Sequence, residues 1–83
     1  MKIRIFKCIG FGNMNNPNHP AKDLLYKHVE FLSQPFEGDR ANFIVAGESG
    51  YIRTSTVQRV NLDNPKIIEF WTRNSHYVFE EVE

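Results

Sequence analysis

One cysteine and three histidines are the side chains of this sequence best suited to nucleophilic chemistry. Cys8 with His28 or His76 would supply a nucleophile and a general base. No local catalytic signature surrounds Cys8, and nothing in the sequence places either histidine beside it. A buried cysteine that acts as a small hydrophobic residue is a far commoner arrangement. We therefore predict no catalytic residue at Cys8.

The same residues are also the candidate ligands for a zinc ion. Structural zinc sites use pairs of ligands that are separated by about two to five residues. Cys8, His19, His28 and His76 contain no pair at such a spacing. The sequence therefore predicts no metal site.

Two further patterns resemble parts of a cofactor site or an active site. Gly10-Phe11-Gly12 begins like a dinucleotide-binding turn, but Asn15 stands at the third glycine position and no second βα unit follows. Glu69, Glu80 and Glu81 would serve acid–base catalysis if they were desolvated. Exposed carboxylates on the outside of a hairpin are the simpler interpretation. We predict no cofactor and no enzymatic activity.

Aromatic and basic residues form the one group of side chains whose types indicate a binding function. The candidate partner-binding residues are Trp71, Arg73, His76, Tyr51 and Arg53. Such side chains dominate the hot spots of protein interfaces, and they also stack nucleobases and contact phosphates. A third interpretation is that Trp71 packs as core beneath a helix or a second layer.

The distribution of charge helps to rank these interpretations. Ten basic residues balance ten acidic ones, whereas nucleic-acid-binding proteins usually carry a basic excess. We therefore expect a protein partner, with self-association included, and we rank single-stranded nucleic acid second. Charge also varies along the chain, since the first strand is basic and the last one is acidic. Opposite charges on adjacent strands attract, so we expect these two strands to be neighbours.

The clearest structural element is a hairpin. Residues 66–73 and 76–82 are rich in β-forming residues and flank Asn74-Ser75, a candidate two-residue turn. This turn pairs Phe70 with Phe79, and it pairs Arg73 with His76. The expected core face carries Ile68, Phe70, Thr72, Tyr77 and Phe79. The opposite, mixed face carries Trp71 and places Glu69 opposite Glu80, for which Arg59 and Lys2 are candidate counter-ions.

The N-terminal half contains a predicted strand, a loop and a helix. Residues 2–9 alternate in polarity, which indicates a strand whose isoleucines lie together on one face. Glycine, asparagine and proline make residues 10–20 a loop. Apolar residues at three- and four-residue spacing predict a helix over 21–33. A short strand over 29–32 is the alternative for the end of this segment.

The remaining segments complete the predicted fold. Residues 43–46 form a short apolar strand, and residues 51–62 form one long bent strand or two strands. The element order is then β-α-β-β-β-β. The sequence thus predicts an α+β domain, a small curved antiparallel sheet or SH3-like barrel of about five strands with one helix.

Two segments of the sequence resemble a known pattern. Thr54-Ser55-Thr56-Val57 and Thr72-Arg73-Asn74-Ser75-His76-Tyr77 are similar to the Thr-Ser-x-Val and Thr-Arg-Asn-Ser-x-Tyr stretches of many short uncharacterised proteins of bacteria, phages and mobile elements. The resemblance implies a compact β-sheet domain of bacterial or phage origin. It suits an accessory protein that binds and modulates a host protein.

The small size of the chain limits the stability that its hydrophobic core can supply. Eighty-three residues predict a single domain, 1–83, with a marginal core. The single cysteine excludes a disulfide within the chain and favours a reducing compartment. No apolar segment is long enough to span a bilayer, and residues 1–7 do not resemble a signal peptide. We expect a cytoplasmic, non-enzymatic binding domain with no membrane contact.

Overall fold

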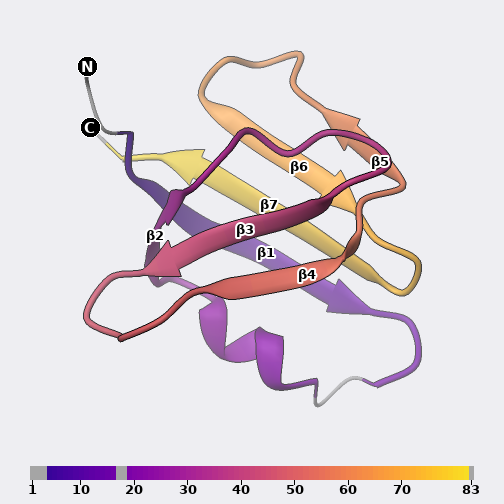
Figure 1. The fold of residues 1–83 in the computed structure, drawn as a ribbon, viewed down its shortest axis with the longest axis horizontal. Helices are drawn as coiled ribbons and strands as arrows, with labels where there is room; N and C mark the ends of the chain where they lie inside the picture. Colours follow the sequence, from indigo (N-terminus) through magenta and orange to yellow (C-terminus); the bar gives the residue numbers. More distant parts are fainter. Residues whose placement is uncertain (1–3, 17–18, 83) are drawn as a thin grey trace.

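The computed structural model describes residues 4–16 and 19–82, and these residues form an almost entirely β-stranded structure (Figure 1). They contain seven strands and one short 3-10 helix. The bounds of these elements are β1 Phe6–Asn13, η1 Pro20–Leu24, β2 His28–Phe31, β3 Arg40–Val45, β4 Ile52–Thr56, β5 Arg59–Asn61, β6 Ile67–Trp71 and β7 Ser75–Glu81. The predicted α+β class with about five strands and one helix is therefore wrong, because the described residues contain no α-helix.

All seven strands belong to one antiparallel sheet, in the order β4-β3-β2-β1-β7-β6-β5. The sheet curls into an open half-barrel (Figure 1). Its edge strands, β4 and β5, are consecutive in the chain and are separated only by Val57 and Gln58. The backbone N–H of Val57 donates to the carbonyl of Asp39 at 2.7 Å, and that of Gln58 donates to the carbonyl of Trp71 at 2.8 Å. These bonds join the two edges at one corner, and residues 51–62 form two strands rather than one.

Aromatic rings on the inner side of the half-barrel form the centre of the core. Phe43, Phe70 and Phe79 have no exposed surface. Phe31 packs edge-to-face against Phe43 and Phe79, with ring centroids 5.4 Å and 5.0 Å apart. Edge-to-face pairs are favoured because the positive edge of one ring meets the negative face of the other. Burial of each ring contributes about 1.5–3 kcal/mol, which compensates for the small size of the domain.

The predicted helix over 21–33 is replaced by a short turn of 3-10 helix and a strand. The helical segment ends at Leu24, and Tyr26 has a φ of 69°, which no helix continues through. The N–H of Tyr26 donates to the carbonyl of Cys8 at 2.7 Å, and the N–H of Cys8 donates to the carbonyl of Lys27 at 3.1 Å. Pairing with β1 thus overrides the helical spacing. The alternative of a strand near residues 29–32 is confirmed by β2.

The first strand is shifted from its predicted position, and its inner face is the opposite one. Phe6 and Cys8 are buried, whereas Ile5 and Ile9 are 36% and 40% exposed. The strand extends to Asn13, and a bulge between Cys8 and Gly10 shifts its register against β7. Residues 1–3, where the predicted strand begins, lie outside the described residues.

The expected adjacency of the first and last strands is confirmed. Lys7 of β1 pairs with Glu80 of β7. Arg4, just before β1, forms an ion pair with Glu81 in which Nε and Oε2 are 2.9 Å apart. The basic and acidic ends of the sequence are thus brought together, as cross-strand attraction predicts.

The β6–β7 hairpin has the predicted faces but a different register. Trp71 pairs with His76 and Phe70 pairs with Tyr77, so the pairing differs by two residues from the predicted one. Glu69 lies opposite Val78 rather than opposite a second glutamate. A shift of two residues leaves each side chain on its own face. The predicted core residues are therefore all buried, and they are Ile68, Phe70, Thr72, Tyr77 and Phe79.

The loop chemistry explains why the predicted turn is wrong. A two-residue type I′ turn needs a positive φ at both central residues. Neither Asn74 nor Ser75 has a positive φ. Four residues, 72–75, instead stand between the last paired residues. The N–H of Thr72 donates to the carbonyl of Ser75 at 2.9 Å, and the N–H of Ser75 donates to Oγ1 of Thr72 at 3.2 Å.

Candidate functional site

Three side chains form a row across the outer face of β5, β6 and β7. The register pairs Arg59 with Trp71 and Trp71 with His76, so all three project from the same side of the sheet. The Arg59 guanidinium carbon lies 4.7 Å from the centre of the Trp71 ring. The His76 ring stacks on the indole at 4.8 Å with an interplanar angle of 12°. The arrangement is a guanidinium–indole–imidazole stack.

A carboxylate and an amide hold the end of this stack in place. The Oε2 of Glu69 lies 2.7 Å from Nε2 of His76. Its Oε1 accepts a hydrogen bond of 3.2 Å from Nδ2 of Asn61. Because Glu69 is fixed from both sides, it orients the imidazole against the indole. The stack is therefore a preorganised surface rather than three independent side chains.

Trp71 is neither core nor freely exposed. Its side chain is half-buried on the outer face, so of the alternatives that the sequence left open, packing as core beneath a helix or a second layer is not the one observed. Strands β5 and β7 flank β6 on opposite sides, so Arg59 and His76 reach the indole from opposite sides. A nucleobase would have to displace one of them before it could stack on Trp71. This geometry leaves mainly the edge of the indole available to a partner.

A shallow apolar groove of about 320 Å³ lies beside the stack. Its walls include Trp71, His76, the loop 72–75 and Met14, whose side chain is 83% exposed. Gly12 lies on the groove, and a Cβ built there would meet no atom within 4 Å. The absence of a side chain thus keeps this part of the groove open. We define the hairpin face by these residues: Gly12, Met14, Arg59, Glu69, Trp71 and His76.

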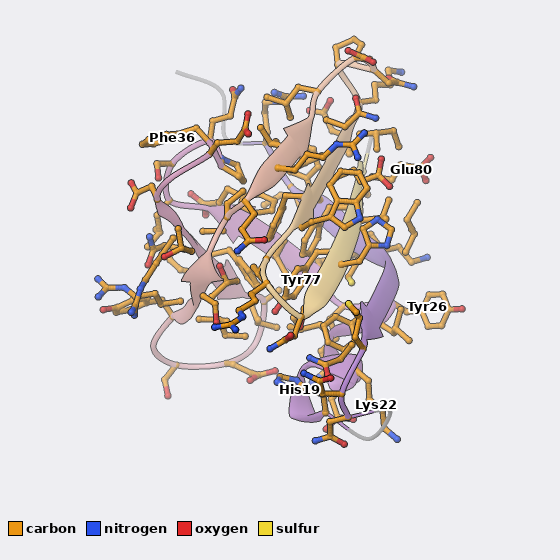
Figure 2. The ribbon with its side chains drawn as sticks, turned by 90° about the vertical axis from the view of Figure 1, so that its right-hand side faces the viewer. His19, Lys22, Tyr26, Phe36, Tyr77 and Glu80 are labelled. Carbon is orange, nitrogen blue, oxygen red and sulfur yellow. The ribbon has the colours of Figure 1, made fainter. Side chains whose placement is uncertain are left out.

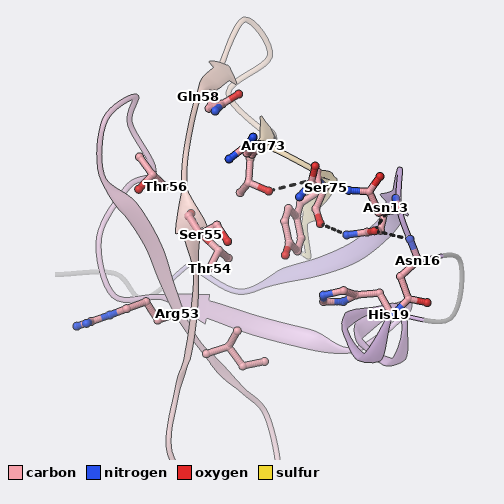
Figure 3. Close-up of a pocket in the computed structure, with 15 residues that line it drawn as sticks. Asn13, Asn16, His19, Arg53, Thr54, Ser55, Thr56, Gln58, Arg73 and Ser75 are labelled. Atoms are coloured by element: carbon pink, nitrogen blue, oxygen red, sulfur yellow. Dashed lines mark hydrogen bonds between the residues drawn. The ribbon is translucent and has the colours of Figure 1, made fainter.

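A second, larger cavity of about 680 Å³ lies on the other side of the loop 72–75, at the opening of the half-barrel (Figure 3). We name it the mouth cavity. Strand β4, the β6–β7 loop, the end of β1 and the following loop line it. Its lining residues are Asn13, Asn15, Asn16, His19, Ile52, Arg53, Thr54, Ser55, Thr56, Gln58, Thr72, Arg73, Asn74, Ser75 and Tyr77.

Hydrogen bonds fix the wall between these two cavities. Nδ2 of Asn13 donates to Oγ of Ser75 at 2.7 Å, which joins the end of β1 to the start of β7. Oδ1 of Asn13 accepts from the backbone N–H groups of Asn15 and Asn16 at 3.0 Å and 2.8 Å. Tyr77 of the mouth cavity is buried toward the interior, whereas Tyr26 and Glu80 project outward (Figure 2). Burial raises the pKa of the Tyr77 phenol.

The five candidate residues from the sequence do not form one patch. Trp71 and His76 stack on the hairpin face, and Arg73 lies beside them on the loop. Tyr51 and Arg53 belong to the β4 side of the half-barrel, where the guanidinium lies 5.9 Å from the tyrosine ring. Figure 3 shows Arg53 directed away from the mouth cavity. Its Nε instead donates to Oδ1 of Asn42 at 3.1 Å.

The sequence did not assign Met14, Gly12 or Asn61 to a site, and it named Arg59 only as a counter-ion. Arg59 reaches Trp71 because the chain crosses from one sheet edge to the other at residues 57–58. No local pattern signals such a crossing. A methionine within an asparagine-rich loop is the one sequence feature that could have indicated this groove.

The catalytic and metal candidates remain dispersed in the structure. Cys8 is completely buried and its thiol donates to the carbonyl of Gly10 at 3.6 Å, whereas His28 is exposed. Burial raises the pKa of the Cys8 thiol, so little of it is the nucleophilic thiolate at neutral pH. Within residues 4–16 and 19–82, no three histidine, cysteine or acidic side chains are grouped to hold a metal ion.

Comparisons with protein-family models, with curated proteins and with solved structures returned no match for this chain. The resemblance to short bacterial and phage proteins stays a prediction. In the described part of the chain, no helix has the length and apolar character needed to cross a membrane.

Proposed function

We propose that this protein is a non-enzymatic binding domain that contacts a protein partner through the hairpin face. The observation that carries the proposal is the Arg59–Trp71–His76 stack beside an open apolar groove. Tryptophan and arginine are the residues that most often dominate protein interfaces. Methionine adapts its shape to an incoming side chain. Trp71 and Met14 line the same groove, and Arg59 contacts the indole.

The charges on this face indicate the chemistry of the partner. Arg59 contacts the indole but forms no ion pair with any described residue. Glu69, in contrast, is already bonded to His76 and Asn61. The partner segment should therefore carry an apolar side chain for the groove and a carboxylate for Arg59. If the resemblance holds, the partner is a host protein.

Single-stranded nucleic acid remains the competing ligand, and the observations favour it less. The indole has a neighbour on each side, and a carboxylate stands within the stack. The chain carries no net charge, so counterion release would contribute little to affinity.

The single buried thiol also supports the expected cytoplasmic location.

Selection of peptides from a random library tests the proposal. The wild-type protein should select peptides with an aromatic or aliphatic residue near an aspartate or glutamate. Trp71→Ala should lose these peptides, with a weakening of about tenfold or more, as hot-spot residues cost at least 2 kcal/mol. Tyr51→Ala is the matched control, because Tyr51 is an exposed aromatic residue outside the hairpin face.

Two results would contradict the proposal. One is a set of peptides that bind Trp71→Ala as well as the wild type. The other is tight binding of single-stranded oligonucleotides that weakens steeply with salt and is lost in Trp71→Ala, which would assign the face to nucleic acid.

A further inference from the structure

We propose that the mouth cavity binds a small phosphorylated molecule that also carries hydroxyl groups, such as a sugar phosphate. This site does not depend on the function proposed for the hairpin face, although residues 72–75 line both the groove and the mouth cavity. The loop 72–75 divides the two, with the groove on its outer side and the mouth cavity on its inner side.

The lining of the mouth cavity has an unusual charge for this chain. None of the fifteen described residues that line it is an aspartate or a glutamate, although the chain contains ten acidic residues. The lining does contain Arg73, and Figure 3 shows its side chain at the rim, on the same side as Gln58. The guanidinium makes no hydrogen bond or ion pair with any described residue. A cation without a counter-ion therefore stands at this opening.

The polar side chains of the cavity fall into two groups. The first group builds the wall: Asn13 donates to Ser75, and Oγ1 of Thr54 accepts from the N–H of Ala41 at 3.1 Å and donates to the carbonyl of Ser55 at 2.7 Å. The second group has its hydrogen-bonding capacity unused. The side chains of Ser55, Thr56 and Gln58 make no hydrogen bond with any described residue.

This division matches the needs of a specific ligand. The groups that are bonded hold the wall rigid, so no ordering cost falls on them when a ligand binds. The unused hydroxyl of Ser55 and the unused amide of Gln58 lie on the side of the opening that faces Arg73 (Figure 3). Neutral hydroxyl and amide groups both donate and accept hydrogen bonds, which suits the hydroxyls of a polyol.

The Arg73 guanidinium and the size of the cavity indicate which anion would bind there. A guanidinium presents a planar fork of donors that matches a phosphate in two parallel hydrogen bonds. The volume of about 680 Å³ lies within the range of small-molecule sites and far exceeds that of a bare phosphate. The polar wall offers the rest of the ligand hydroxyl partners rather than apolar contact. A phosphate ester of a polyol satisfies both requirements.

Titration of the ¹⁵N-labelled protein with ribose 5-phosphate tests this proposal by nuclear magnetic resonance. Ribose and inorganic phosphate are the two comparison probes. We expect amide shifts confined to residues 52–58 and 72–75 with ribose 5-phosphate at about 1 mM, weaker shifts with phosphate, and none with ribose. Arg73→Gln should weaken binding by about tenfold or more, since a charge-assisted bidentate contact is lost.

Two further variants make the result decisive. Ser55→Ala removes an unused hydroxyl from an exposed position, and it should weaken ribose 5-phosphate more than inorganic phosphate. Arg40→Gln is the matched control, because it removes an exposed arginine of β3 outside the mouth cavity and should leave binding unchanged. Equal affinity for phosphate and ribose 5-phosphate would overturn the proposed ligand class. Binding that Arg73→Gln does not weaken, or no shifts at about 10 mM probe, would overturn the site itself.

Discussion

The two faces of the β6–β7 hairpin carry stacked aromatic pairs that look alike but serve different purposes. On the inner face, Phe70 and Tyr77 stack with centroids 4.8 Å apart. On the outer face, Trp71 and His76 stack at the same distance, one residue nearer the β6–β7 loop on each strand. The inner pair is buried, whereas the outer pair is half-exposed and is held by a carboxylate. The same pairing geometry therefore supplies stability on one face and a contact surface on the other.

The largest expected effect lies on the inner face. Phe79→Ala removes a ring that has no exposed surface and contacts Phe31 and Phe43. We expect a loss of about 3–5 kcal/mol in the free energy of unfolding, which can unfold so small a domain. Urea denaturation measures it, with Val78→Ala on the outer face as control. A loss below about 1 kcal/mol for Phe79→Ala would remove the distinction between the faces.

Trp71→Ala should have a smaller effect on stability than on binding. The indole is half-buried, so its removal should cost less than a buried ring, about 1–2 kcal/mol including the lost contact with Arg59. Thermal and urea unfolding test this expectation. A loss as large as that of Phe79→Ala would mean that Trp71 belongs to the core.

The ionisable groups of the inner face predict a loss of stability at alkaline pH. Burial raises the pKa values of Tyr77 and Cys8 in the folded state, whereas the ordinary values are 10.0 and 9.0. Their neutral forms are thus favoured on folding, and the unfolded chain deprotonates first. The stability is fully present below about pH 9 and is lost as the pH rises through the folded-state pKa values.

Unfolding of the wild type between pH 8 and pH 11 measures this loss, in comparison with the double variant Cys8→Ala/Tyr77→Phe. The variant should show a flatter dependence on pH, because it lacks both groups. The same slope in both proteins would show that other groups cause it.

Glu69→Gln should have the smallest effect on stability. The ion pair with His76 is partly exposed, with side-chain exposures of 39% for the histidine and 24% for the glutamate. Such pairs contribute about 0–1 kcal/mol, so the melting temperature should change little. Peptide binding should still weaken if Glu69 orients the stack. A variant with full affinity would show that the orientation of His76 is unimportant.

The hairpin shows which parts of the fold a sequence can predict. Alternation assigned Phe70, Tyr77 and Phe79 to the core and Trp71 to the opposite face, and the structure confirms this assignment. The register was wrong because it depends on loop torsion angles, and alternation is insensitive to a shift of two residues. Local sequence patterns thus predict the face of the sheet on which a side chain lies better than they predict which residues pair across strands.

The errors in the N-terminal half have a common physical cause. The spacing of apolar residues over 21–33 favours a helix locally, yet the backbone pairs with β1 and β3 instead. The inner face of β1 follows Phe6 and Cys8, because the half-barrel closes around aromatic rings rather than around the isoleucines. Pairing between strands that are distant in sequence decided both the loss of the helix and the inner face of β1. Such pairing leaves no signal within a short stretch of sequence.

The candidate site was predictable only in part. Trp71 and His76 were recognised by residue type and do lie together. The other half of the site depends on residues 57–58, which carry the chain between the sheet edges and bring Arg59 to the stack. Tyr51 and Arg53 were grouped with Trp71 by composition, and the same topology separates them.

Mapping a selected peptide on the ¹⁵N-labelled protein is the most direct test of the central claim. We expect the amides that shift to belong to residues 12–14, to β5 and to the outer-facing positions of β6 and β7. Amides of β3 and β4 should not shift. Shifts that cluster on β3 and β4, with residues 12–14 and 71–76 unaffected, would contradict the assignment of the hairpin face as the contact surface.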